Sequence, residues 1–222
     1  MNRPVIILGS GGHARVLLDT LLLQPVEVIG LADPCLSRGG KLLGVNILGG
    51  DEAVLGYSPD EVELVNGLGS IGDTAPRKFL YEKFKEKGYC FARVIHPSAV
   101  IAGDLRLGEG VQIMAGVVIQ PGSSIGSNAI INTRASVDHD CVVGDHAHLA
   151  PGVTLSGGVR VGNEAHLGTG AVVIQGIRIG ERSTVGAGAV VIRDIPGEMT
   201  VIGIPARVVG GKRSTRGGKQ DE

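Results

Sequence analysis

Residues 124–155 read SIGSNAIINTRASVDHDCVVGDHAHLAPGVTL, and an aliphatic side chain recurs there at every sixth position. The same period runs without interruption from Ile101 to Val191, over sixteen positions. It fits neither an α-helix nor an ordinary strand, whose side chains repeat every 3.6 and 2 residues. A chain that turns a corner every six residues and buries one side chain on each flat face has this period. The repeat therefore predicts a parallel β-helix of hexapeptides.

Two finer patterns support this prediction. Small or aliphatic residues, such as Ala129 and Cys141, stand two positions before the aliphatic ones, as expected of corners that point into a narrow prism. Glycines also recur every eighteen residues, so three hexapeptides make one triangular coil, and we attribute these glycines to a positive φ at the corner. Sixteen hexapeptides then give about five coils and a prism about 25 Å long. The recurring glycines are Gly108, Gly126, Gly144, Gly162 and Gly180.

The first ninety-five residues follow a different plan. Val5–Leu8 reads as a buried strand, and a glycine-rich turn and a helical pattern to about residue 23 follow it. Asp73 or Thr74 can cap a second helix that runs to Lys87. A strand, a glycine turn, a helix and another strand form the nucleotide-binding β-α-β unit. Further strands are predicted over residues 26–31, 62–67 and 89–94.

The glycine turn is a candidate phosphate site. Residues 9–14 fit the pattern G-x-G-x-x-A, and Asp33 follows about twenty residues later. Such a turn lets a phosphate approach backbone N–H groups at a helix N-terminus. Because the domain is too short for two mononucleotide halves, a nucleotide-linked sugar is favoured over NAD. A tight turn that needs glycine only for packing, and an Asp33 that serves only as a turn residue, remain open alternatives.

Composition and charge exclude several classes of protein. The formal net charge of −1 gives no field for a polyanion, so no nucleic-acid partner is expected. No apolar run reaches the length of a membrane span, and no signal peptide is evident, so we expect a cytoplasmic protein without membrane insertion. Three scattered cysteines are expected to be free thiols. The predicted domains are an α/β Rossmann-like unit over residues 1–95, a β-helix over 96–210 and a flexible tail over 211–222.

The candidate catalytic residue is His139, which lies between Asp138 and Asp140 on the corner after Val137. This position should present the imidazole outward. An adjacent carboxylate can bind Nδ1–H, fix the tautomer and raise the basicity of the ring, and we choose Asp140 for this role. His139 is then a competent general base near neutral pH. A solvated histidine on a polar corner is the alternative.

His148 and His166 are eighteen residues apart, so they should stack on one face, one coil apart. They are interpreted either as part of a cleft wall or as two ligands of a metal site. A zinc site needs a third ligand, and His146 lies on a different part of the turn. No metal is therefore expected, and a zinc enzyme of the carbonic anhydrase type is a lesser alternative.

Several motifs together resemble one family, the sugar acetyltransferases typified by the sialic acid O-acetyltransferase group. The resemblance is strongest to acetyl-CoA-dependent N-acetyltransferases that act on nucleotide-linked 4-amino-4,6-dideoxy sugars. It covers residues 3–210 and implies a left-handed coil and a homotrimer with CoA between neighbouring prisms. The motifs are Gly11-Gly12-His13, Asp33, Ile95-His96-Pro97-Ser98-Ala99, Ile131-Asn132-Thr133, Val137-Asp138-His139-Asp140-Cys141 and Gly203-Ile204-Pro205-Ala206-Arg207.

The resemblance also implies roles for individual residues. His139 matches the catalytic base, Asp140 the acid that raises its basicity, and Asn132 a residue near the sugar amine. Acetyl-CoA would be bound at positions that match His148, Thr169 and Ala187. The nucleotide-sugar pocket would include Gly11, Gly12, His13, Asp33 and Gly69. Close relatives often carry an acidic residue and asparagine where this chain has Ser70 and Ile71, which leaves the nucleotide base open.

The implied reaction is direct transfer. The 4-amine of the sugar would attack the thioester carbonyl of acetyl-CoA, His139 would accept the proton, and a backbone N–H would hold the oxyanion. O-acetylation of sialic acid or a related sugar is the nearest alternative. A non-catalytic nucleotide-sugar binder is a further one, in which replacement of His139 would change nothing.

Overall fold

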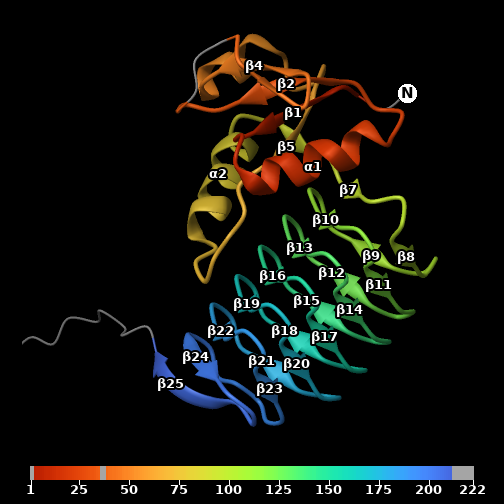
Figure 1. Ribbon diagram of the computed structural model, residues 1–222, viewed down its shortest axis with the longest axis vertical. Helices are drawn as coiled ribbons and strands as arrows, with labels where there is room; N and C mark the ends of the chain where they lie inside the picture. The colour runs from red at the N-terminus through yellow and green to blue at the C-terminus, as the bar shows by residue number, and fades with distance from the viewer. Residues whose placement is uncertain (1–2, 36–38, 212–222) are drawn as a thin grey trace, which may run out of the picture.

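The computed structural model describes residues 3–35 and 39–211, so the tail predicted over 211–222 lies outside the described part except for Gly211. An α/β domain sits at one end of a long parallel β-helix, whose coils lead away from it (Figure 1). The predicted fold class, a Rossmann-like α/β domain followed by a left-handed parallel β-helix, is confirmed. No helix among the described residues is long and apolar enough to cross a membrane.

The N-terminal domain is built on a six-stranded sheet with the order β3-β4-β2-β1-β5-β6, in which only β3 runs antiparallel to its neighbour. Two α-helices and a 3-10 helix, η1, complete the domain. The helices are α1 (Gly12–Leu22), η1 (Asp51–Gly56) and α2 (Ala75–Lys85). The strands are β1 (Val5–Leu8), β2 (Val28–Ala32), β3 (Lys41–Leu42), β4 (Val45–Gly49), β5 (Glu63–Asn66) and β6 (Cys90–Phe91).

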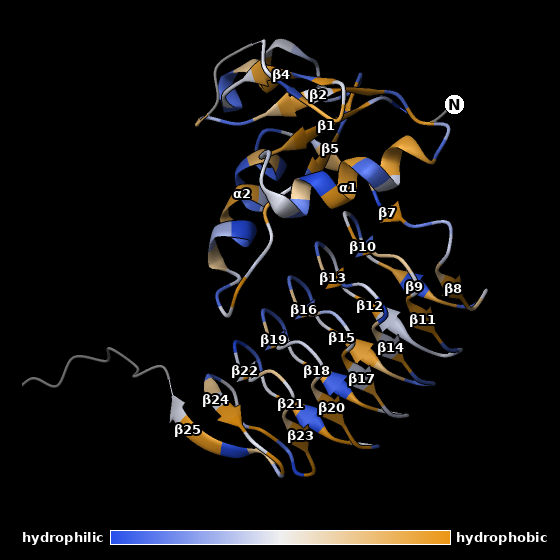
Figure 2. Ribbon diagram, viewed as in Figure 1, coloured by the Kyte–Doolittle hydropathy of each residue, from blue (hydrophilic) through white to orange (hydrophobic). Residues whose placement is uncertain are grey.

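Strand β1 lies between β2 and β5, so the sheet has its topological switch point at β1. In open α/β sheets, ligands bind at this point beyond the carboxyl ends of the strands. Figure 2 shows β1 as continuously hydrophobic, whereas α1 alternates between apolar and polar turns. This agrees with a fully buried central strand and a helix that covers one layer of the core.

The β-helix has three flat faces, and from coil to coil each strand pairs in parallel with one eighteen residues further on, a spacing that shortens to sixteen at the last parallel pair of the first face. The first face holds β7 (Val94–Ile95), β10 (Gln112–Ile113), β13 (Ile130–Ile131), β16 (His148–Leu149), β19 (His166–Leu167), β22 (Thr184–Val185) and β24 (Met199–Ile202), and β25 (Arg207–Gly211) pairs antiparallel with β24. The second face holds β8 (Val100–Ile101), β11 (Val118–Ile119), β14 (Ser136–Val137), β17 (Thr154–Leu155), β20 (Val172–Val173) and β23 (Val190–Val191). The third face holds β9 (Arg106–Leu107), β12 (Ser124–Ile125), β15 (Val142–Val143), β18 (Arg160–Val161) and β21 (Arg178–Ile179).

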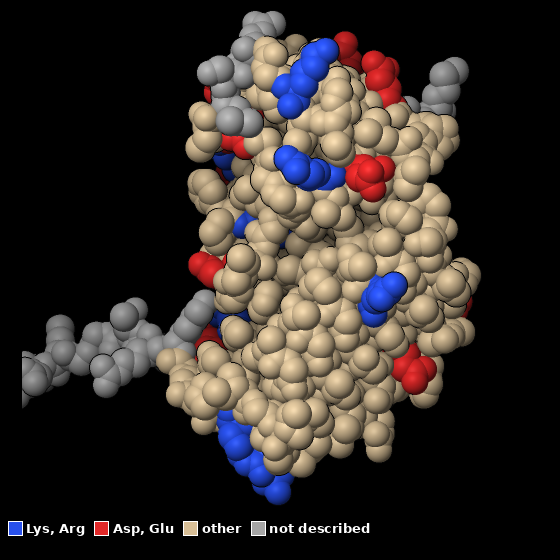
Figure 3. Space-filling model, viewed as in Figure 1, with Lys and Arg blue, Asp and Glu red and all other residues tan. Residues whose placement is uncertain are grey.

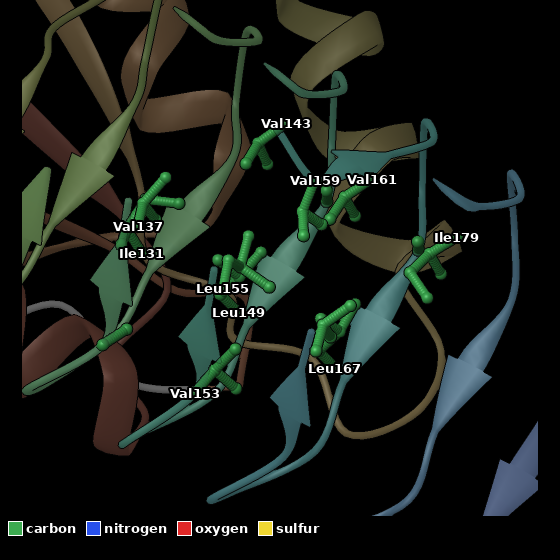
Figure 4. Close-up of a cluster of buried hydrophobic side chains, with 14 of the residues drawn as sticks. Ile131, Val137, Val143, Leu149, Val153, Leu155, Val159, Val161, Leu167 and Ile179 are labelled. Carbon is green, nitrogen blue, oxygen red and sulfur yellow. The ribbon is translucent and has the colours of Figure 1, made fainter. Parts of the chain in front are cut away.

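The interior of the prism is filled by the residues that the six-residue period predicts. Figure 4 shows ten labelled side chains of this buried cluster, among them Val137, Val143 and Leu149 from three successive strands. The small corner residues, such as Ala129 and Cys141, are also fully buried. One aliphatic side chain per face and one small side chain per corner therefore form a continuous core along the prism.

The prediction that the recurring corner glycines have a positive φ is wrong. None of the five spaced by eighteen residues has a positive φ. A Cβ on Gly126 would instead lie 2.5 Å from the amide nitrogen of Asp145 in the next coil. Positive φ occurs two residues further along each corner, for example at Asn128 and Asp140. The glycines are therefore needed because successive coils approach each other closely at this corner.

The two parts share their core. Strand β7, which precedes the predicted boundary at residue 96, pairs with β10 as the first strand of the first face. Val94 and Met114 pack in one cluster with Leu17 and Leu21 of α1. The α/β domain is thus seated on the first face of the β-helix, and this placement forms the cavity described below.

Candidate functional site

A cavity of about 700 Å³ opens at the carboxyl ends of β1, β2 and β5 and is closed on one side by the first face of the β-helix. Seven of the residues predicted from the sequence meet in it, although they come from both domains. They are Gly11, Gly12, His13, Asp33, Gly69, Asn132 and His148. The other lining residues are Gly9, Ser10, Val16, Gly67, Leu68, Ser70 and Ile71.

The N-terminus of α1 forms one wall of this cavity. A Cβ on Gly11 or Gly12 would meet nothing within 4 Å, so the backbone N–H groups of this turn are open to a ligand. The first turn of α1 has no acidic residue, and none of the cavity-lining residues within 3–35 and 39–211 is a lysine or arginine. This wall can therefore attract an anion through backbone N–H groups and the helix dipole.

Asp33 is held by the protein itself. Its Oδ2 accepts hydrogen bonds from the amide nitrogen of Ser10 at 2.9 Å and from the Ser10 hydroxyl at 2.5 Å, and its Oδ1 accepts one from the amide of Cys35 at 2.8 Å. Burial acts to raise the pKa of Asp33, but these hydrogen bonds lower it below its ordinary value. The carboxylate is thus both a turn residue and part of the cavity wall.

His13 is held neutral and in one tautomer. Gln112 donates from Nε2 to the carbonyl of Asn66 at 2.8 Å, so its Oε1 faces His13 Nε2 at 2.7 Å and accepts a hydrogen bond from the Nε2–H group. Burial, with the nearby charge of Arg77, lowers the pKa of His13 to about 4. The Nδ1 atom of His13 is therefore an unprotonated acceptor.

A second neutral imidazole, that of His148, connects the two domains. Asn132 Oδ1 accepts from the amide of Thr133 at 2.8 Å, so the Asn132 amide group donates to His148 Nε2 at 3.2 Å. The proton of His148 is then on Nδ1 and is donated to Ser70 Oγ at 2.7 Å. Burial, with the neighbouring His166, lowers the pKa of His148 to about 3. Ser70 accepts this bond and keeps its own hydroxyl proton for a group in the cavity.

His148 and His166 stack one coil apart, as predicted, with their ring centroids 5.0 Å apart in an edge-to-face arrangement. Nδ1 of His166 is buried without a hydrogen-bond partner in the described chain. Among residues 3–35 and 39–211, no group of three or more metal-ligating side chains is close enough to hold an ion.

A buried network that the sequence analysis missed supports the cavity loop at residues 67–70. The guanidinium of Arg77 is fully buried and has no carboxylate partner among the described residues. It donates to the carbonyls of Asn66 and Leu68 at 2.9 and 2.6 Å and to that of Asn128 at 3.3 Å. Burial lowers the pKa of Arg77 to about 9, so it carries a charge at neutral pH. Arg77 thus fixes the loop and adds a positive charge behind it.

His139 and Asp140 form the expected pair. His139 Nδ1 lies 2.8 Å from Asp140 Oδ2, which leaves Nε2 as the free nitrogen of the ring. The hydrogen bond that His139 donates to Asp140, with the nearby charge of Asp138, raises the pKa of His139 above its ordinary value. The His139 side chain is 63% exposed, as expected for a residue presented outward. A base of this kind can accept a proton from a substrate that reaches Nε2.

The structure does not bring this pair into the cavity of its own chain. Asn132 is on the corner between the first and second faces, whereas His139 is on the corner between the second and third faces. Thr169 and Ala187 are exposed on the same corner as Asn132, and Gly188 donates to the Thr169 carbonyl at 2.8 Å. Asn132, Thr169 and Ala187 therefore follow one edge of the prism, and His139 another.

Comparisons with known proteins agree with this architecture. The PglD N-terminal domain family matches residues 4–84, and the bacterial transferase hexapeptide family matches residues 104–137 and 122–157. PerB, the perosamine N-acetyltransferase of Caulobacter crescentus, solved with CoA and GDP-perosamine, is 43% identical, with 93% of this chain and 97% of that chain covered and a TM-score of 0.86. Two further structures of that enzyme, with the same ligands, carry a histidine replaced by asparagine or alanine.

Two other solved structures cover nearly the whole chain. The acetyltransferase domain of PglB from Neisseria gonorrhoeae, solved with acetyl coenzyme A, is 33% identical, with 94% of this chain and 100% of that chain covered and a TM-score of 0.87. WeeI from Acinetobacter baumannii is 26% identical with the same coverage and a TM-score of 0.80.

The fold and the matched families define an acyltransferase of the hexapeptide-repeat class. More narrowly, the chain belongs to the PglD-like sugar acetyltransferase family. This confirms the expected class of enzyme, an acetyl-CoA-dependent sugar acetyltransferase.

Proposed function

We propose that this protein transfers the acetyl group of acetyl-CoA to the 4-amine of a nucleotide-linked 4-amino-4,6-dideoxy sugar. The observation that carries the proposal is the cavity in which seven predicted residues from two domains meet. Its helix N-terminus suits a diphosphate, and its volume falls in the range of small-molecule sites. The similarity to an enzyme solved with CoA and GDP-perosamine supports this class of substrate.

In this proposal His139 is the general base. The free sugar amine attacks the thioester carbonyl, the carbon–sulfur bond breaks as the tetrahedral adduct collapses, and CoA leaves as the thiolate, which His139 then protonates to the thiol. His139 Nε2 accepts the proton that the amine loses, and Asp140 stabilises the resulting imidazolium through Nδ1. His148 stays neutral, because its pKa is about 3, and orients Ser70 and Asn132 toward the bound groups. A backbone N–H holds the oxyanion.

The separation of His139 from the cavity supports a site made by two copies of the chain. The second face offers a surface for assembly, because its strands begin with uncharged residues throughout. The third face carries three exposed arginines, and the first face is largely covered by the α/β domain. On the side of the β-helix that faces the viewer in Figure 3, the charged side chains stand apart from one another on a mostly uncharged surface. We propose a homotrimer in which CoA follows the edge of Asn132, Thr169 and Ala187.

A thiol-release assay with acetyl-CoA tests the function. The panel contains UDP-, GDP- and dTDP-linked 4-amino sugars, the corresponding 4-hydroxy sugars and sialic acid. We expect CoA release only with a nucleotide-linked amine. Release with sialic acid alone would assign O-acetylation, and no release with any amine would contradict the proposal. His139→Ala should lower kcat with the active amine by about 10² to 10⁴, as for loss of a general base.

A further inference from the structure

The imidazole of His139 lies against Gly157, which occupies the same corner one coil further along. A Cβ on Gly157 would lie 2.5 Å from Nε2, 2.6 Å from Cε1 and 3.1 Å from Cδ2 of the ring. Contacts below 3.0 Å are too short for a real Cβ. The ring therefore occupies the space that any side chain at position 157 would need.

The turn itself does not require glycine at this position. Gly157 has no positive φ, and the left-handed residue of this turn is Gly158, whose φ is +69°. Most other turns carry a side chain at the position that matches Gly157. Examples of these side chains are those of Thr133, His139, Asp145, Asn163, Gln175 and Glu181.

A second glycine faces the other member of the pair. In the preceding coil, a Cβ on Gly122 would collide with Oδ1 of Asp140. Gly122 has a φ of +73°, so its backbone also favours glycine. The His139–Asp140 pair thus lies between two positions that lack side chains. At Gly122 the backbone conformation also favours glycine. At Gly157 the contact with the His139 ring is the one reason for glycine that the described residues show.

We propose that Gly157 is a positioning residue for His139: because Gly157 has no side chain, the imidazole can lie against this corner with Nδ1 toward Asp140. The exposed ring has one hydrogen-bonded side-chain partner, Asp140, so the backbone of Gly157 is the surface that limits its rotation on the other side. Any effect of Gly157 on catalysis rests on the proposed role of His139 as the general base.

Gly157→Ala tests this inference in the full-length protein. Because the ring is exposed, it can turn away from the new methyl group, and we expect the variant to fold with a Tm close to that of the parent. The matched control is Gly103→Ala, at the equivalent turn position of the same corner three coils earlier. A Cβ there meets nothing within 4 Å, and Gly103 has no positive φ.

Two quantities are measured in both variants, the kcat of acetyl transfer and the midpoint of the His139 ring-proton titration by NMR. In Gly157→Ala, the ring should lose its fixed contact with Asp140, so the titration midpoint should fall toward 6.5. We expect kcat to fall about ten- to a hundredfold, the order of loss caused by a small displacement of a catalytic group. Gly103→Ala should change neither quantity.

The outcomes separate this inference from the proposed function. An unchanged midpoint and an unchanged kcat in Gly157→Ala would overturn the positioning role. A rise in the KM for acetyl-CoA without a change in midpoint would also overturn it, because the methyl group would then obstruct CoA. A lowered midpoint with full kcat would support the positioning role and contradict the use of His139 as the base.

Discussion

Asn132 and His139 belong to the same coil but lie on two different corners, with strand β14 of the second face between them. Asn132 borders the cavity and donates to His148, whereas His139 pairs with Asp140 at the far edge of the second face. One prism therefore cannot present both groups to one substrate. In the proposed trimer, the Asn132 edge of one prism can meet the His139 edge of its neighbour.

Disruption of the second face should abolish turnover but leave binding of the nucleotide sugar in the cavity intact. Val172→Lys places a charge among uncharged neighbours in the proposed interface, and we expect a monomer by light scattering and loss of acetyl transfer. The nucleotide sugar should still bind in calorimetry, because the cavity is formed within one chain. Val142→Lys on the third face is the control and should remain a trimer. An active Val172→Lys monomer would refute the shared site.

The pH dependence of kcat/KM should report the His139–Asp140 pair. The base works in its deprotonated form, and its pKa is raised, so the acidic limb should have its midpoint above 6.5. Asp140→Asn should move this midpoint to lower pH and reduce the maximum rate. Asparagine tolerates the left-handed backbone found at this position, where φ is +58°. If the midpoint of the acidic limb does not move in Asp140→Asn, that midpoint reports the pKa of the substrate amine and not that of His139.

Stability should fall as the solution becomes mildly acidic. His13 and His148 have native pKa values of about 4 and 3 but titrate near 6.5 when unfolded, so the unfolded chain binds more protons between these limits. The stabilisation that the two neutral imidazoles contribute is therefore fully present above pH 6.5 and is lost as pH falls toward 4. Between pH 6.5 and 5 the two groups together should cost about 3 kcal/mol of unfolding free energy.

Urea unfolding at a series of pH values measures this dependence, and His148→Gln should make it shallower over the same interval. An unfolding free energy that stays constant from pH 6.5 to 5 would mean that neither imidazole is held neutral.

The corner glycines should be sensitive to a single methyl group. A Cβ on Gly144 would lie 2.6 Å from the amide nitrogen of Asn163 in the next coil, so Gly144→Ala must separate two hydrogen-bonded coils. We expect a loss of stability of about 2 kcal/mol or more, as for an overpacked site. Gly103→Ala, which meets no atom within 4 Å, should stay within about 0.5 kcal/mol of the parent. Equal stability of the two variants in thermal unfolding would argue against the close approach of coils.

Features that depend on spacing were predictable from the sequence. The distance of eighteen residues between His148 and His166 is one coil, and the rings stack as expected. The cause assigned to Gly126 was wrong, because a positive φ and a close backbone approach both favour glycine, and the period does not distinguish them. Strand β4 was missed because glycines at positions 44, 49 and 50 make this short segment look like a loop.

Contacts between the two domains could not be read from the chain. The hydrogen bond from His148 to Ser70 joins residues 78 positions apart and forms only when the α/β domain is seated on the first face. The same holds for Arg77 and Asn128. No periodicity relates these pairs, so the neutral state of His148 follows from burial in the folded protein and not from its sequence neighbours.

Subunit complementation tests the shared site most directly. His139→Ala removes the proposed base, and Gly12→Asp places a carboxylate at the N-terminus of α1 where the diphosphate should bind. A Cβ on Gly12 meets nothing within 4 Å, so the second variant should fold. Each should be inactive alone. After dissociation and reassembly of a one-to-one mixture, about a quarter of the sites in a random trimer combine an intact His139 with an intact cavity. We predict recovery of about a quarter of the parent activity, and a mixture that remains inactive while forming mixed trimers would contradict the account.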